Sequence, residues 1–102
     1  MVVNVTQKDF QNHIKDGFVL VDFWSPCCPP CKALGIVLDN LSRELGIKVV
    51  KVNADGDLGL AERYGVRGLP TMIFMNNGNE VHRIVGYQDQ SSLKEVIQKL
   101  NH

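Results

Sequence analysis

A near-continuous run of β-branched and aromatic residues, Phe18–Trp24, constrains the fold of this chain more than any other segment. Such runs are typical of a central strand that is covered on both faces and usually lies parallel to its neighbours. A membrane-spanning helix needs about 20 apolar residues, whereas this run is short and carries Asp22. We therefore expect a buried strand in an α/β domain, and no membrane span.

The segments around this run alternate between strand and helix patterns. Apolar runs that predict strands cover residues 2–5, 48–53, 71–75 and 80–85. Helical patterns follow Thr6, the cysteine cluster at 27–31, Asp57 and Asp89, and the three polar residues suit N-cap positions. The first helix is expected to end near Gly17, and Asn77-Gly78 predicts a two-residue hairpin.

The predicted order of elements is β-α-β-α-β-α-β-β-α. Because β-α-β crossovers are right-handed, the first half is expected to form a parallel unit, to which the hairpin adds an antiparallel pair. We therefore expect an α/β fold with a mixed central sheet and helices on both faces. A chain of 102 residues supports a single domain spanning residues 1–102.

The net charge and the N-terminal residues indicate which partners and which location to expect. Eleven Lys and Arg residues balance eleven Asp and Glu residues, so the formal net charge is zero. Binding nucleic acid through a broad basic face needs a surplus of Lys and Arg, so no nucleic-acid partner is expected. The first residues show no basic stretch followed by an apolar one, so no secretory signal is expected.

All three cysteines, Cys27, Cys28 and Cys31, lie in one short segment. A disulfide scaffold spreads its cysteines along the chain and connects distant loops. The clustered arrangement instead predicts a local chemical site in a reducing compartment, and we expect the protein to be cytoplasmic.

The spacing of Cys28 and Cys31 suits the start of a helix. If Cys28 is the N-cap, Cys31 is the third helical residue, and its backbone N–H can donate to the Cys28 sulfur. That donor and the positive end of the helix dipole favour the thiolate, which is the form that attacks disulfides. Pro29 and Pro30 fit the first two helical positions, where a missing N–H costs little. The same spacing places the two sulfurs within bonding reach.

Two other interpretations of these cysteines are inert buried residues and a metal site. Buried cysteine is common, but Cys-Pro-Pro-Cys between a strand and a helix is poor core material. Zinc needs about four ligands, and His13, His82 and His102 show no ligand spacing with the cysteines. We therefore expect no metal bound within one chain, while a metal shared between two chains stays open.

The chain resembles the thioredoxin family over nearly its whole length. The matching segments are Val21–Trp24, Cys28–Lys32, Lys51–Asp55, Gly65–Thr71, Asn77-Gly78 and Val85-Gly86. The resemblance implies the thioredoxin fold and protein disulfide reductase activity by thiol–disulfide exchange. It also implies a monomer without a bound cofactor, because the redox chemistry resides in a Cys28–Cys31 disulfide. The implied partners are client proteins with disulfides and a thioredoxin reductase.

The resemblance assigns roles to four residues. Cys28 is the implied nucleophile, and Cys31 is the implied resolving thiol. Asp22 matches a buried acid that accepts the proton of the resolving cysteine, and Lys51 matches a lysine that neighbours and modulates this acid. Burial in an apolar strand independently predicts a raised pKa for Asp22. Lys51 could equally be an ordinary surface lysine.

The resemblance assigns two further groups. The implied active-site loop comprises Trp24, Cys27, Pro29, Pro30 and Lys32. The implied substrate-docking surface comprises Leu69, Pro70, Thr71, Gly86 and Tyr87, and the Leu69-Pro70 bond is expected to be cis.

Three positions depart from the family pattern. Cys27 stands where the family usually has Trp, and Pro29 stands where it usually has Gly. Gly35 lies in the region of the following helix where the family has a kinking proline. Loss of the indole removes a large apolar contact, and Pro29 removes a potential N–H donor to the thiolate. We interpret Cys27 as a passive small side chain, with a modification target and a second attacking thiol as alternatives.

Three other functions remain open at this point. They are a thiol oxidase or isomerase of the same fold, a partner-binding module without redox turnover, and a metal or redox sensor that uses all three thiols. The lack of a charged residue between Cys28 and Cys31 favours a reductase over an oxidase. The intact cysteine pair argues against binding as the only role.

Overall fold

The computed structural model describes residues 1–101 and contains one five-stranded mixed sheet. Its elements are β1 Val2–Val5, α1 Phe10–Ile14, β2 Phe18–Trp24, α2 Pro29–Leu45, β3 Lys48–Asn53, α3 Leu58–Arg63, β4 Thr71–Asn76, β5 Asn79–Val85 and α4 Gln90–Leu100. The strand order is β1-β3-β2-β4-β5. The first three of these pair in parallel, whereas β4 runs antiparallel to both β2 and β5. The predicted order of elements and the mixed sheet are confirmed.

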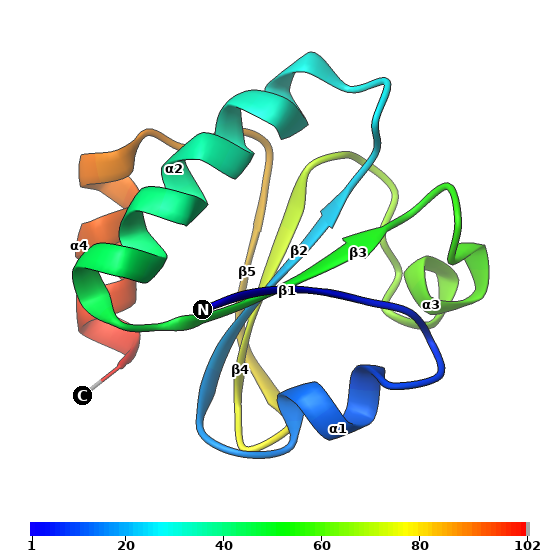
Figure 1. The fold of residues 1–102 in the computed structure, drawn as a ribbon, viewed down its shortest axis with the longest axis horizontal. Helices are drawn as coiled ribbons and strands as arrows, with labels where there is room; N and C mark the ends of the chain where they lie inside the picture. Colours follow the sequence, from blue (N-terminus) through cyan, green and yellow to red (C-terminus); the bar gives the residue numbers. More distant parts are fainter. Residues whose placement is uncertain (102) are drawn as a thin grey trace.

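The sheet lies between two helical layers, with α2 and α4 on one face and α1 and α3 on the other (Figure 1). The strand β2 supplies both cores because successive side chains point to opposite faces. Val19, Val21 and Phe23 join the cluster that includes α1 and α3, and Leu20 joins the cluster that includes α2 and α4. The prediction of a central strand covered on both faces is therefore confirmed. Asp22 is two residues after Leu20, so its side chain points to the same face, the one covered by α2 and α4.

Two of the helix starts form as the sequence predicts. Cys28 is the N-cap of α2, with prolines at the first two helical positions. Asp89 is the N-cap of α4, and its side chain accepts a hydrogen bond of 2.8 Å from the backbone N–H of Ser92. Gly46 ends α2 with a φ of 66°, the left-handed conformation that glycine adopts at little cost.

The prediction for the first helix was wrong at both ends. Thr6 is not the N-cap, because its carbonyl closes a turn with the N–H groups of Asp9 and Phe10 before the helix begins. Its own N–H donates to the Asp9 carboxylate at 2.9 Å. The helix ends at Ile14 rather than near Gly17. Gly17 instead exchanges hydrogen bonds with Asn77, its N–H donating to Asn77 Oδ1 at 2.8 Å.

Asp57 occupies the predicted N-cap position of α3 but does not cap it with its side chain. Its Oδ1 accepts a hydrogen bond of 3.1 Å from the backbone N–H of Gln7. The carboxylate therefore connects the segment after β1 to the start of α3, a tertiary contact that local sequence rules do not detect.

The hairpin between β4 and β5 forms at the predicted residues. Asn77 and Gly78 have φ values of 52° and 84°. Positive φ at both central residues is the requirement of the type I′ turn that fits the twist of two antiparallel strands. The hairpin places the end of β5 next to the beginning of β4, where Val85 pairs with Thr71.

Candidate functional site

The cysteine pair lies at the start of α2, directly after the turn that leaves β2 (Figure 1). Cys28 has extended backbone angles, with φ −121° and ψ 101°, and its sulfur accepts a hydrogen bond of 3.3 Å from the backbone N–H of Cys31. The two sulfurs form a disulfide, with the Cα atoms 5.2 Å apart. The predicted helix-start geometry and the predicted reach between the sulfurs are both confirmed.

The three cysteines differ in access. Cys31 is buried, with 2 % of its surface exposed. Cys28 is half-buried, and Cys27 is an exposed free cysteine. An incoming sulfur can therefore reach Cys28 more readily than Cys31. The next two residues, Pro29 and Pro30, are exposed and have no N–H to donate to the Cys28 sulfur.

Asp22 lies on β2, the strand that leads into this turn, and none of its surface is exposed. Neither carboxylate oxygen has a hydrogen-bond partner among the described residues. In the sheet it pairs with Lys51 on β3 and with Met72 on β4. Burial raises the pKa of Asp22 from 3.8 to about 7, although the charge of Lys51 acts in the opposite direction. The predicted direction of the shift is confirmed.

Lys51 is half-buried rather than an ordinary surface lysine. Its ammonium lies 4.8 Å from the ring centroid of Trp24, a cation–π arrangement. A Cβ atom at Gly35 would lie 3.4 Å from Lys51 Nζ. Gly35 of α2 therefore lies next to this ammonium, and a side chain there would contact it.

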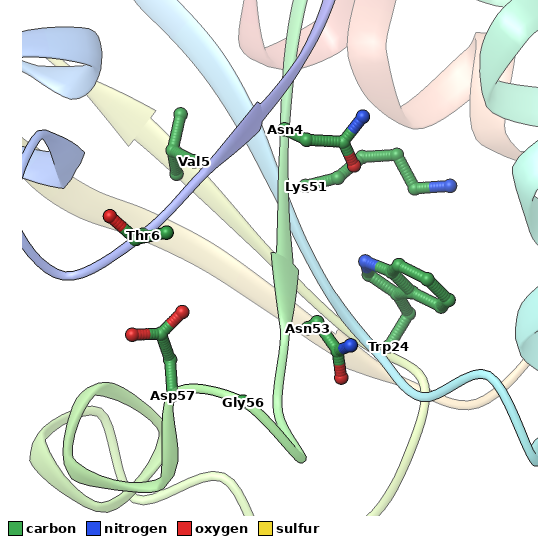
Figure 2. Close-up of a pocket in the computed structure, with 8 residues that line it drawn as sticks. All are labelled: Asn4, Val5, Thr6, Trp24, Lys51, Asn53, Gly56 and Asp57. Atoms are coloured by element: carbon green, nitrogen blue, oxygen red, sulfur yellow. The ribbon is translucent and has the colours of Figure 1, made fainter.

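A pocket of about 430 Å³ lies beside these residues, near the edge strand β1. Its lining residues are Asn4, Val5, Thr6, Trp24, Lys51, Asn53, Gly56 and Asp57. Figure 2 shows Lys51 and Trp24 extending from β3 and β2 at one side of this pocket. The cysteines do not line it, so this pocket is not where the dithiol would meet a substrate.

The sheet register brings the predicted docking residues to the same edge as the cysteine turn. Thr71 at the start of β4 pairs with Phe23, which directly precedes Trp24 at the end of β2. Pro70, next to Thr71, therefore lies at the edge of the sheet from which the Cys28 turn leaves. The Leu69-Pro70 bond is cis. The Pro70 carbonyl accepts a hydrogen bond of 2.8 Å from the N–H of Gly86.

Exposed apolar side chains lie close to Gly86 in sequence. Tyr87 is 45 % exposed and Val85 is 62 % exposed. Val85 belongs to a segment that resembles the family, but it was not predicted to lie on the docking surface. A Cβ atom at Gly68 would lie 3.3 Å from Val85 Cγ1. An apolar residue at the end of an edge strand, directly before the Gly86 turn, is the signal that could have identified it.

Ser25 is a second residue that sequence analysis missed. It is buried, with 7 % of its surface exposed, and directly follows β2. Its Oγ accepts a hydrogen bond of 3.3 Å from the Cys27 N–H and donates one of 2.7 Å to Asp55 Oδ2. A serine two residues before an amide that needs an acceptor is a known turn signal, and it could have predicted this contact.

The described histidines lie apart from the cysteines in their contacts. His13 lies 3.8 Å from Asp9, and His82 packs against Phe74 with ring centroids 5.6 Å apart. His102 lies outside the described residues. Within residues 1–101, no group of three or more His, Cys, Asp or Glu side chains could bind a metal ion. No helix in that range is long and apolar enough to cross a membrane.

Comparisons with known proteins agree on one family. A family profile described as Thioredoxin matches residues 1–99. Thioredoxin from Bacillus subtilis is 36% identical over 100 residues, covering 96% of each chain. Thioredoxin from Chlamydia trachomatis is 42% identical over 100 residues, covering 97% of this chain and 98% of that one. A solved mutant thioredoxin from Halobacterium salinarum superimposes with a TM-score of 0.93 at 32% identity, covering 99% of this chain and 91% of that one.

Proposed function

Because this chain belongs to the thioredoxin family and is a protein-disulfide oxidoreductase, we propose that it reduces client disulfides through its Cys-Pro-Pro-Cys segment. The observation that carries this proposal is the arrangement of Cys28 and Cys31. One sulfur is half-buried and accepts the N–H of the third helical residue, while the other is buried within bonding reach. We propose that Cys28 is the nucleophile and Cys31 the resolving thiol.

In the first step the Cys28 thiolate attacks one sulfur of a client disulfide. The client S–S bond breaks, a mixed disulfide forms, and the other client sulfur leaves as a thiolate. The Cys31 N–H and the positive end of α2 stabilise the Cys28 thiolate before the attack. Pro29 and Pro30 add no further donor, so the Cys31 amide is the hydrogen bond that the helix start supplies to this sulfur.

In the second step Cys31 attacks the Cys28 sulfur. Its proton passes to Asp22, whose pKa of about 7 suits a group that accepts and returns a proton near neutral pH. The mixed S–S bond breaks, the client leaves as a dithiol after protonation, and a Cys28–Cys31 disulfide remains. Lys51 lowers the pKa of Asp22 and so keeps it from remaining protonated throughout the physiological range.

The proposed docking surface is the sheet edge formed by Leu69, Pro70, Thr71, Gly86 and Tyr87, beside the loop residues Trp24, Cys27 and Lys32. The register that pairs Thr71 with Phe23 supports this assignment, as does the exposure of Tyr87. We interpret Cys27 as a passive neighbour of the nucleophile, because it precedes the N-cap and is not placed to receive the helix-start N–H groups.

Several wider properties follow from the same proposal. The partners are disulfide-containing client proteins and a thioredoxin reductase that returns two electrons to the Cys28–Cys31 disulfide. The chain acts as a monomer of one domain, without a bound cofactor, because both redox states reside in the two sulfurs. We place it in the cytoplasm on the basis of its clustered cysteines, which are typical of a reducing compartment.

The Cys31→Ser variant tests this proposal. Without the resolving thiol, the mixed disulfide between Cys28 and a client cannot be released by the second step, and we expect it to accumulate in near-stoichiometric yield. Nonreducing electrophoresis with mass spectrometry would identify the adduct and its cysteine. Cys31→Ser combined with Cys28→Ser is the matched control, and it should trap nothing. If the single variant traps no adduct, or traps it through Cys27, the assigned roles are wrong.

A further inference from the structure

The turn that presents Cys28 is fixed by hydrogen bonds to one residue, Ser25. The backbone N–H of Cys27 donates to the Ser25 hydroxyl at 3.3 Å. The backbone N–H of Cys28 donates to the Ser25 carbonyl at 3.2 Å. Ser25 therefore accepts hydrogen bonds from both backbone N–H groups that immediately precede α2. These contacts help to fix the backbone on which the Cys28 sulfur is placed.

Asp55 orients the hydroxyl that makes the first of these contacts. The Ser25 Oγ–H donates to Asp55 Oδ2 at 2.7 Å. A hydroxyl has one hydrogen and two acceptor positions, so donation to Asp55 leaves the oxygen free to accept from Cys27.

Asp55 is itself held in place by the turn after β3. Its N–H donates to Asn53 Oδ1 at 3.0 Å. The neighbouring Ala54 N–H donates to the Trp24 carbonyl at 2.8 Å. The turns after β2 and β3 leave the same end of the sheet (Figure 1) and are connected by these contacts. Asp55 therefore connects the turn after β3 to Ser25, and through Ser25 to the backbone of the cysteine turn.

We propose that Ser25 and Asp55 are positioning residues for the Cys28–Cys31 couple. By fixing the Cys27 and Cys28 backbone, they keep the Cys28 sulfur close to the Cys31 sulfur when both are thiols. This raises the effective concentration of one thiol toward the other and so favours the disulfide. The inference rests on the proposed roles of Cys28 and Cys31. It assigns to Asp55 a role separate from that of Asp22, which accepts a proton.

The test is the equilibrium between the protein and glutathione. The protein dithiol gives two electrons and two protons to glutathione disulfide, which yields the protein disulfide and two glutathione thiols. Loss of one ordinary hydrogen bond changes an equilibrium by about threefold to tenfold. We expect Ser25→Ala and Asp55→Ala each to lower this equilibrium constant by that factor, an upward shift of about 15 to 30 mV in the two-electron potential.

Conservative variants separate positioning from charge and from folding. Ser25→Thr keeps the hydroxyl, and Asp55→Asn keeps an acceptor oxygen without the charge, so both should stay within about twofold of the parent constant. Asp55 is exposed, so its variants should fold even if Ser25→Ala does not. Ser91→Ala is the matched control, because the Ser91 hydroxyl also donates to an aspartate, Asp89, at 3.0 Å, but at the start of α4.

The double variant completes the test. If the two residues act through one hydrogen-bond chain, Ser25→Ala combined with Asp55→Ala should lower the constant no further than either change alone. Additive effects, or parent-like constants in both alanine variants, would overturn the positioning role while leaving the proposed function intact. If the parent protein itself shows no Cys28–Cys31 couple in glutathione buffers, the proposed function fails, and the positioning role fails with it.

Discussion

Replacing Cys28 with serine is expected to reduce turnover of a disulfide-bonded protein substrate to the uncatalysed background. The assay would use dithiothreitol as the electron source and follow loss of the substrate disulfide. The thiolate, not the hydroxyl, attacks disulfide sulfur. The Cys31 N–H and the start of α2 would still be present, but there would be no thiolate for them to stabilise.

Cys27→Ser is the matched control for that prediction. It removes an adjacent and exposed thiol without changing the N-cap residue. We expect turnover to stay within about twofold of the parent, because Cys27 is not placed to receive the N–H groups of the helix start. Near-parent activity of Cys28→Ser, or loss of activity in Cys27→Ser, would show that the nucleophile has been assigned to the wrong residue.

Replacing Asp22 with asparagine is expected to slow the release of the mixed disulfide at pH 7 by at least about tenfold. A positioned proton acceptor contributes typically about 10²–10⁴ to a proton-transfer step, and asparagine cannot accept the Cys31 proton. The first step should be nearly unchanged, because Cys28 attacks as a thiolate and transfers no proton to Asp22 in that step. Rapid-mixing kinetics that resolve the two steps would check this, and equal slowing of both steps would contradict it.

The same variant should change how stability depends on pH. In the folded protein Asp22 has a pKa of about 7, against an ordinary value of 3.8. Between these values the unfolded chain loses the proton that the folded chain retains, so the free energy of unfolding falls as pH rises. The upper limit of this loss is about 4 kcal/mol, and it is complete above the folded pKa.

Asp22→Asn removes that titration. We expect the variant to lack the decrease in stability between about pH 4 and 7 that the parent shows, and to be the more stable of the two at pH 8. Denaturant titrations at several pH values would measure both curves. Parallel curves for parent and variant across this range would mean that burial does not raise the pKa of Asp22.

The parts of the fold that could be predicted are those in which local chemistry determines structure. The β2 run, the Asn77-Gly78 turn and the Asp89 cap depend on residues that act within a few positions of themselves. The Cys28 cap belongs to the same class, because an N-cap and its third helical residue are close in sequence. These features therefore form where short-range rules place them.

The predictions that failed concern polar residues with more than one possible hydrogen-bond partner. Thr6 and Asp57 both suit N-cap positions. Thr6, however, closes a preceding turn with its carbonyl, and Asp57 accepts the N–H of Gln7, which is far away in sequence. The N-cap pattern does not show which partner a polar residue takes, and for Asp57 that partner comes from a segment far away in sequence.

In the site, too, some features follow from local sequence and others depend on contacts between distant segments. The cysteine spacing and the raised pKa of Asp22 follow from local sequence and burial. The role of Gly35 does not, because the sequence presents it only as a departure from a kinking proline. In the structure α2 continues through this position, and the glycine lies next to the Lys51 ammonium, which stacks over Trp24.

The reduction potential of the Cys28–Cys31 couple tests the central claim most directly. The protein would be equilibrated in glutathione buffers of graded ratio, trapped with an alkylating mass tag and digested, so that each cysteine is read separately. We predict a single two-electron transition in which Cys28 and Cys31 change together, with a midpoint at or below about −230 mV, as suits a reductase. A midpoint near about −120 mV, as in a strong thiol oxidase, or a transition that does not involve both residues, would contradict the account.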